Sequence, residues 1–374
     1  MTVGKDSYLP SDAGLKQNVD DVLSYVLLTT VISGTESKEE CFRWWNKAVD
    51  LVLRLGFDFE ARAAGNTQFS GHIPSEESYE ERRRAFWLVF ALDRHLAFTF
   101  NEPLRLQNFD CEVLCPLPEW IWQSPEGVSL KNVPTRTYGP PTQINGTGFF
   151  EYFLPLMNSL GNILELRSRD LGEADKALKV MTIEAMLADC EESLHALEVV
   201  KKALDPGALQ GNCFILPISC SSFGDPADER HTDDQRAELP TSYGKYIVQV
   251  LQGLLEETKE VAFSINGAGK GFKIGDCIAD IMQVDKHLSF MPFLFGVYLF
   301  HGSLSFLSLT GQMTLAGADE KAKRGVGAIV RAHEVALRSL DTSFQVRSDF
   351  KVFSEYPNVK RGTSHVSSGS IPAW

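Results

Sequence analysis

The sequence predicts an all-α fold, a single large helical domain with long irregular loops. Apolar residues recur at spacings of three and four along most of the chain, whereas segments with the strict alternation of a β-strand are scarce. Several of the periodic segments also begin and end with residues that favour helix termini. The 374 residues are 44% hydrophobic and 23% charged, so the chain can bury a large core.

The first helices are predicted from their periodicity and from their ends. A first helix is expected at residues 15–33. In the next segment Ser37 and Glu40 form a capping box, and Gly56 stands where a left-handed residue closes a helix. The apolar stripe between these ends consists of Phe42, Trp45, Val49 and Val52.

A third helix carries a charge pair within its apolar face. Ser78 and Glu81 form a second capping box, and the helix is expected to run through Leu96. Its apolar body contains Asp93 and Arg94. A charge pair in such surroundings is costly unless the two groups satisfy each other or neighbouring polar atoms, so the segment indicates a specified buried arrangement.

The remaining elements follow from the same periodicity. Helices are expected at 149–168 with Pro155 as a kink, 173–203, 241–264, 276–311 in one or two pieces, and 318–342. Two long segments rich in turn residues, 124–147 and 205–240, are expected to be irregular. The end of the chain is expected to be a divergent, disordered tail.

The charge balance bears on partners and compartment. The formal net charge of −13 means that the surface as a whole is repelled by a polyphosphate backbone, which argues against DNA contact by this chain alone. Residues 1–27 begin polar and acidic and lack the pattern of a signal peptide, so the cysteines are expected to be reduced thiols.

One apolar stretch admits two interpretations. Residues 288–318 contain no Asp, Glu, Lys or Arg, as in a membrane span. Pro292, Gly296 and several serines and threonines interrupt the stretch, and no Lys/Arg cluster sets an orientation. These interruptions favour a buried helix over a membrane span.

Sequence patterns of catalysis are weak. Residues 267–271, Gly-Ala-Gly-Lys-Gly, lack the outer glycine and the Ser or Thr of a phosphate-binding loop, so they are interpreted as a flexible connection between two helices. The chain contains no Gly-x-Ser-x-Gly elbow and no His-Glu-x-x-His zinc helix, and its eight histidines are scattered. We therefore expect no enzymatic activity, no catalytic residues and no cofactor.

Four segments resemble a known family. They are EERRRAFWLVFALDRHL at 80–96 followed by NEPL at 101–104, CFRWWNKAVDLVLRLG at 41–56, GFFEYFLPLM at 148–157 and IVRAHE at 329–334. Together they are similar to the middle homology region of fungal zinc-cluster transcription factors, in the branch that activates xylan- and starch-degradation genes. The resemblance extends from the first helix to about residue 344 and implies a regulatory domain at 1–344 and a tail at 345–374.

The chain also departs from this family. Family members bind DNA through an N-terminal zinc cluster with six cysteines, two pairs of which have Cys-x-x-Cys spacing. No two of the seven cysteines here have that spacing. Cys213 and Cys220 reproduce one internal spacing of such a cluster, but a tetrahedral metal site needs four ligands, so we interpret them as ordinary apolar side chains.

Candidate site residues lie in the charged and aromatic helix. Arg94 or His95 could face a pocket and bind an inducer's carboxylate or hydroxyl groups, which the forked guanidinium suits. Alternatively Asp93 and Arg94 lock the helix to its neighbours, an interpretation favoured because a buried charge without its partner costs roughly 3–5 kcal/mol. Arg84 and Trp87 of the same helix complete the set of regulatory or structural candidates.

The resemblance implies a regulator of RNA polymerase II transcription, located in the nucleus. Its expected partners are the transcription machinery or full-length relatives and a small-molecule inducer, with no membrane. Promoter DNA would be reached only through an N-terminal module, and zinc is expected only in that module. The alternatives are a stand-alone helical fragment that modulates full-length relatives, a helical small-molecule-binding protein or enzyme, and a membrane protein.

Overall fold

The computed structural model describes residues 17–33, 37–60, 75–106, 112–123, 135–203, 233–259, 265–288, 295–315 and 320–339. Within these ranges the chain forms ten α-helices, and its β pairing is limited to the isolated bridges Phe59–Glu112 and Leu114–Tyr138. The predicted all-α fold is confirmed. The helices are α1 (Val19–Ser33), α2 (Lys38–Arg54), α4 (Glu76–Phe100), α5 (Glu119–Trp122), α6 (Phe149–Ser168), α7 (Glu173–Ala203), α8 (Asp233–Thr258), α9 (Ile265–Val284), α10 (Phe295–Leu315) and α11 (Glu320–Ser339).

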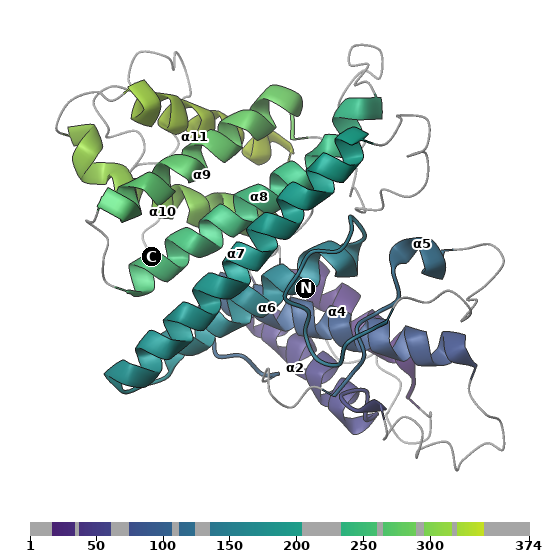
Figure 1. Ribbon diagram of the computed structural model, residues 1–374. Helices are drawn as coiled ribbons and strands as arrows, with labels where there is room; N and C mark the ends of the chain where they lie inside the picture. The colour runs from purple at the N-terminus through teal and green to yellow at the C-terminus, as the bar shows by residue number, and fades with distance from the viewer. Residues whose placement is uncertain are drawn as a thin grey trace, which may run out of the picture.

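The helices form two groups, and α6 and α8 make the contacts between them. Figure 1 shows α7 and α8 side by side across the front of the molecule, with α9, α10 and α11 on one side and α2, α4 and α6 on the other. Helix α6 contacts α4, α7 and α8, and α8 contacts α9 and α10. Helices α6 and α8 therefore connect the N-terminal group to the C-terminal group.

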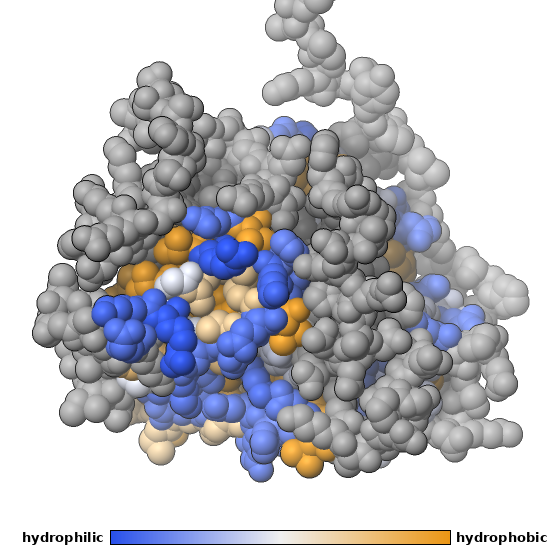
Figure 2. Space-filling view, turned by 90° about the horizontal axis from the view of Figure 1, so that it is seen from above, coloured by the Kyte–Doolittle hydropathy of each residue, from blue (hydrophilic) through white to orange (hydrophobic). Residues whose placement is uncertain are grey.

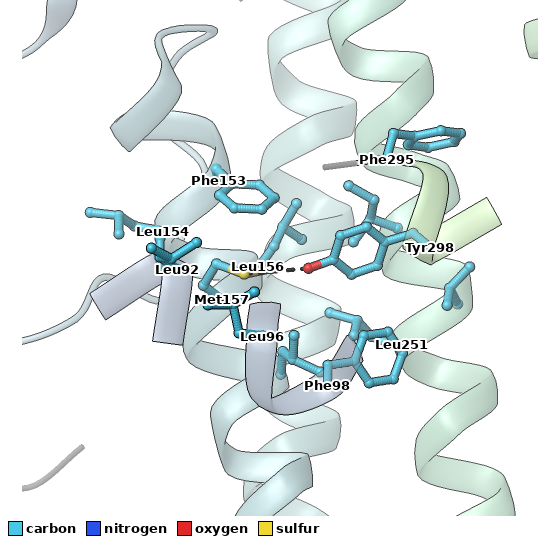
Figure 3. Packing of buried hydrophobic residues seen from close by; sticks show 14 of the residues in the cluster. Leu92, Leu96, Phe98, Phe153, Leu154, Leu156, Met157, Leu251, Phe295 and Tyr298 are labelled. Carbon is cyan, nitrogen blue, oxygen red and sulfur yellow. Dashed lines mark hydrogen bonds between the residues drawn. The ribbon is translucent and has the colours of Figure 1, made fainter. Parts of the chain in front are cut away.

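A continuous apolar core lies where the two groups meet. Figure 3 shows side chains of α4, α6, α8 and α10 packed together, among them Phe98, Leu251 and Tyr298. The Tyr298 hydroxyl donates a hydrogen bond to the Met157 sulfur at 3.4 Å. Tyr298 of α10 is fully buried. No helix in the described part of the chain is long and apolar enough to cross a membrane.

The predicted helix ends are confirmed at α2 and wrong at α4. Ser37 is the N-cap of α2, although its side chain makes no capping hydrogen bond, and Gly56 has the left-handed φ of 68°. Helix α4 begins at Glu76, and its N-cap is Ser75, whose side chain accepts the N–H of Ser78 at 3.2 Å. Ser78, the expected N-cap, therefore lies inside the helix, and the predicted start of α4 is about one turn too late.

Two further boundaries differ from the prediction. The segment 205–240 was expected to be irregular, but α8 already begins at Asp233. The stretch 276–311, expected to be helical in one or two pieces, contains parts of two helices, α9 and α10. The predicted helices at 149–168 and 173–203 are confirmed, and Pro155 lies inside α6.

The interpretation of residues 267–271 as a flexible connection is wrong, because they lie inside α9. Glycine disfavours a helix locally, but here it permits close helix packing. A Cβ at Gly271 would lie 2.8 Å from Thr310 of α10, and a Cβ at Gly275 would lie 2.8 Å from Phe306. The absence of a Cβ therefore permits close packing against α10 at Gly271 and Gly275, whereas a Cβ at Gly269 would meet nothing within 4 Å.

Several predictions lie outside the described residues. They concern the tail at 345–374 and the boundary before it, Cys213 and Cys220, and most of the segment 205–240. In the segment 124–147, the described residues 135–147 are irregular, as predicted.

Candidate functional site

All five candidate residues lie on α4, the longest helix of the N-terminal group, which is buried along most of its length. Because apolar residues occupy nearly every position from Ala85 to Phe98, the helix has no solvent-facing side over this stretch. Its polar side chains must therefore find partners inside the protein. A charge network around Asp93 provides partners for Asp93 and Arg94, and a second network surrounds Glu80 near the start of the helix, whereas the buried Nδ1 of His95 has no hydrogen-bond partner among the described residues.

The Asp93 carboxylate is the centre of the first network. It accepts the indole N–H of Trp45 at 3.1 Å and the backbone N–H groups of Arg105 at 3.1 Å and Leu106 at 3.1 Å. The Arg94 guanidinium donates to the same carboxylate at 3.1 Å. The carboxylate thus joins α4 to α2 and to the segment that follows α4.

Arg94 is enclosed by protein atoms. Its guanidinium lies 3.4 Å from the centre of the Phe90 ring, and both Asp93 and Arg94 have 0% of their surface exposed. Burial raises the pKa of the Asp93 carboxyl, and the charge of Arg94 and the two backbone amides oppose that rise. This enclosed geometry is what the structural interpretation of the pair requires.

His95 points into the contact between α4 and α10. Its ring is buried and lies 6.0 Å from the ring of Tyr298. Burial, with a contribution from nearby His301, lowers the pKa of His95 to about 3. The imidazole is therefore uncharged at neutral pH and cannot supply a positive charge for an anionic ligand.

The Glu80 carboxylate is the centre of the second network, at the N-terminal end of α4. It is fully buried and accepts the backbone N–H of Leu117 at 2.6 Å. Arg136 donates to it at 2.9 Å and Arg83 at 3.4 Å, and a guanidinium nitrogen of Arg84 lies 3.8 Å away. Three guanidinium groups therefore surround one buried carboxylate, which makes the desolvation of that carboxylate tolerable.

Arg84 extends this network to α5 and α6. Its guanidinium pairs with the Glu119 carboxylate and donates to the backbone carbonyl of Leu117 at 3.3 Å. The same group lies 5.0 Å from the centre of the Trp122 ring and 4.9 Å from that of Phe150. Arg84 is thus held by charge and by aromatic faces at once.

Trp87 and Arg83 attach the segment that contains Leu114. The Trp87 indole N–H donates to the Leu114 carbonyl at 2.8 Å, and the Leu114 N–H donates to the Glu60 carboxylate at 3.1 Å. Glu60 in turn accepts two hydrogen bonds from Arg83, at 2.7 and 3.1 Å. Side chains at the start of α4 therefore hold, directly and through Glu60, a segment that has no regular secondary structure.

The sequence reasoning missed the members of these networks that lie outside the candidate set. Glu80 is not one of the candidate residues, but it is the buried carboxylate that Arg83, Arg84 and Arg136 surround. An acid followed by Arg at three and four positions, ahead of a fully apolar helix, could have identified it. No local pattern marks Trp45, Glu60, Arg105 or Arg136 as partners.

The described residues offer little chemistry for catalysis or metal binding. In this part of the chain no group of three or more His, Cys, Asp and Glu side chains is arranged to hold a metal ion. Burial raises the pKa of Cys41 to about 11 and that of Cys190 to about 12, so these thiols stay protonated at neutral pH. Two open hollows, of about 350 and 400 Å³, lie beside α7.

Comparison with known proteins gives a consistent result. The family model of the fungal specific transcription factor domain matches residues 6–201. The xylanolytic transcriptional activator xlnR of Aspergillus clavatus is 30% identical over 389 residues, covering 87% of this chain and 39% of that protein. The proteins of the same name from Aspergillus terreus and Emericella nidulans are each 32% identical, again over 87% of this chain, and 40% and 42% of their own lengths are covered.

The chain thus spans about two fifths of the length of these curated relatives. No solved structure gives a significant match.

Proposed function

Because the chain belongs to the fungal specific transcription factor domain family, we propose that it is the regulatory domain of a zinc-cluster-type transcription regulator. Its targets would be polysaccharide-degradation genes transcribed by RNA polymerase II. The observation that carries this proposal is the similarity to xylanolytic activators over 87% of the chain. The relatives are transcriptional activators, which supports a regulatory role over a catalytic one.

The physical properties of the chain support an indirect role at the promoter. With a net charge of −13, its surface repels DNA, so promoter binding in the nucleus would require a separate zinc-cluster module. The two networks join α4 to α2, α5 and α6 in one packed body. Regulation then requires that an inducer or partner binds two conformations of this body with different affinity, since equal binding shifts no equilibrium.

The proposal is tested by a fusion of the chain to an unrelated DNA-binding domain in a filamentous fungus. A reporter gene carries sites for that domain, and cells are grown on glucose or on xylan as the carbon source. We expect reporter expression to depend on the carbon source, because the fused chain supplies the nutrient response. The DNA-binding domain alone is the control, and it should give the same expression on both carbon sources.

An equal reporter signal on the two carbon sources would contradict the proposed role, provided that the fusion is present at equal amounts in both cultures. A bound metabolite that is chemically changed during incubation with the purified chain would instead favour an enzyme.

A further inference from the structure

Helix α7 exposes an unusual amount of apolar surface along one side. Leu178, Met181 and Val199 are 66%, 65% and 55% exposed. Together with exposed alanines they form what we call the outer face of α7, whose apolar members are Ala174, Ala177, Leu178, Met181, Ala185, Ala188, Ala196 and Val199. A single exposed apolar residue needs no explanation, but eight of them along one side of a helix mark an interaction site.

The outer face is distinct from the side of α7 that enters the core. The buried residues of α7 include Ile183, Leu187 and Leu194, on the side that packs against α6 and α8. In Figure 1, α7 runs across the front of the molecule. The lower edge of Figure 2 corresponds to that front, and apolar side chains project there between hydrophilic ones.

The spacing of the outer face suits another helix. The exposed positions 174, 178, 181, 185, 188, 192, 195 and 199 follow one another at alternating intervals of four and three, as along a coiled-coil seam. Glu192 and His195 are the two polar members of this seam. This line is about 38 Å long at 1.5 Å per residue. Alanines at its centre, Ala185 and Ala188, allow a second helix axis to approach within about 8 Å.

The charges beside the outer face indicate what kind of helix would bind. Asp189 and Glu192 border a hollow of about 350 Å³, and neither carboxylate has an ion-pair partner among the described residues. Ile144 and Leu197 line the same hollow and supply apolar walls. A Lys or Arg side chain fits this site, because its stem packs on apolar walls while its charged end meets two carboxylates.

The hollow is already formed without a partner. The backbone N–H of Ile144 donates to the Ser193 hydroxyl at 3.1 Å, and the Cys190 thiol donates to the Thr142 carbonyl at 3.4 Å. These bonds fix residues 142–144 against α7. A partner would therefore lose little affinity to reordering of this surface.

On the opposite edge of α7 two glutamates are already paired. Glu198 forms an ion pair with Lys245 at 2.6 Å, and Glu184 pairs with Lys259. A second copy of the chain, whose net charge is −13, would add its own Asp189 and Glu192 to the contact. Charge complementarity therefore favours a basic partner over self-association.

We propose that the outer face of α7 is a docking surface for an amphipathic helix of a partner protein, and that a basic side chain of this helix enters the hollow beside Asp189 and Glu192. The docking surface is a property of α7 itself and holds whether or not the chain responds to a carbon source. Helix-in-groove recognition of this kind uses apolar anchors for affinity and charges for specificity.

The probe is a synthetic, fluorescently labelled peptide of about three heptads, with Leu along its seam and Lys on both flanks. A second peptide has Glu in place of every Lys. Binding of both to the full chain is measured by fluorescence anisotropy. We expect the basic peptide to bind at least about tenfold more tightly than the acidic one, a difference of about 1.4 kcal/mol.

A matched pair of variants locates the site. Leu178→Glu changes the outer face, and Leu27→Glu makes the same change at an equally exposed leucine on α1, since the two are 66% and 65% exposed. We expect Leu178→Glu to weaken binding of the basic peptide about tenfold or more and Leu27→Glu to change it less than about twofold. Circular dichroism and urea unfolding check that both variants fold like the parent.

Glu192→Lys provides a second variant that does not alter the apolar line. This variant should bind the basic peptide more weakly and the acidic peptide more tightly than the parent chain does. Met181 provides a direct footprint, because the bound peptide should protect its exposed sulfur from oxidation by hydrogen peroxide, read by mass spectrometry.

The proposal is wrong if the basic peptide does not bind, if Leu27→Glu weakens binding as much as Leu178→Glu does, or if Met181 is not protected. It is also wrong if sedimentation shows that the parent chain is a dimer that Leu178→Glu dissociates, because a second copy would then occupy the outer face.

Discussion

Replacing Asp93 by alanine should destabilise the protein strongly, because the buried groups that bind its carboxylate would lose their partner. Arg94 would keep its charge in a site with no exposed surface. Losing the partner of a buried charge costs about 3–5 kcal/mol. The indole of Trp45 and the amides of Arg105 and Leu106 would also lose their acceptor, at about 1–3 kcal/mol for each donor that water does not reach.

These costs are not additive, because the space vacated by the carboxylate can admit water that satisfies some of the donors. We therefore expect a loss of at least about 3 kcal/mol in the free energy of unfolding. With a urea dependence of about 3 kcal/mol per molar, the unfolding midpoint would fall by about 1 M. Far-UV circular dichroism is the preferred readout, since Trp45 fluorescence would respond to the mutation itself.

Two controls make this test specific. Asp50→Ala removes an exposed aspartate of α2 and should change the stability by less than about 0.5 kcal/mol. Adding Arg94→Met to Asp93→Ala removes the uncompensated charge and should recover about 1–3 kcal/mol. The reasoning is refuted if Asp93→Ala has the same midpoint as Asp50→Ala, or if the double variant is as unstable as the sum of the single ones.

The other predictions concern the second network, pH and helix packing. Glu80→Ala removes the carboxylate that pairs with Arg136 and that accepts the Leu117 N–H, and should cost about 3–5 kcal/mol by urea unfolding, whereas a similar cost at exposed Glu81 would contradict a special role for Glu80. Burial lowers the pKa of His95 to about 3, so the unfolded chain takes up a proton that the native state refuses. Stability should fall as pH drops from about 6.5 toward 3, by up to about 1.4 kcal/mol per pH unit from this group. Parallel pH profiles of the parent and of His95→Leu would count against this reasoning. A Cβ at Gly302 would overlap side chains of α8, so Gly302→Ala should lose about 1–3 kcal/mol in thermal or urea unfolding. Gly296→Ala on the same helix meets nothing within 4 Å and should be neutral or slightly stabilising, and equal losses at the two glycines would rule out the packing argument.

Sequence patterns predicted the helices best where local signals agreed. The helices at 149–168 and 173–203 were predicted to the residue, because long apolar periodicity is bounded there by turn residues. The start of α4 was placed too late, since Ser75 and Ser78 both have the chemistry of an N-cap and local sequence does not choose between them.

Local sequence patterns likewise predicted one part of the candidate site and missed another. A charge pair within an apolar helix was enough to predict a buried arrangement around Asp93 and Arg94. It did not predict that Arg105 and Leu106 would supply backbone donors, because that depends on where the chain turns after α4. Nor did it predict that Glu80 would be buried, since an acid in the first turns of a helix is usually solvated.

The sequence by itself thus determined the helical class, most helix positions, the acidic character and the family, because these follow from periodicity, composition and local motifs. Only the tertiary structure decided which side of α7 faces outward, which backbone amides satisfy Asp93, and which glycines of α9 pack closely against α10. These features depend on contacts between residues distant in the chain. Such contacts outweigh local preference wherever burial is complete.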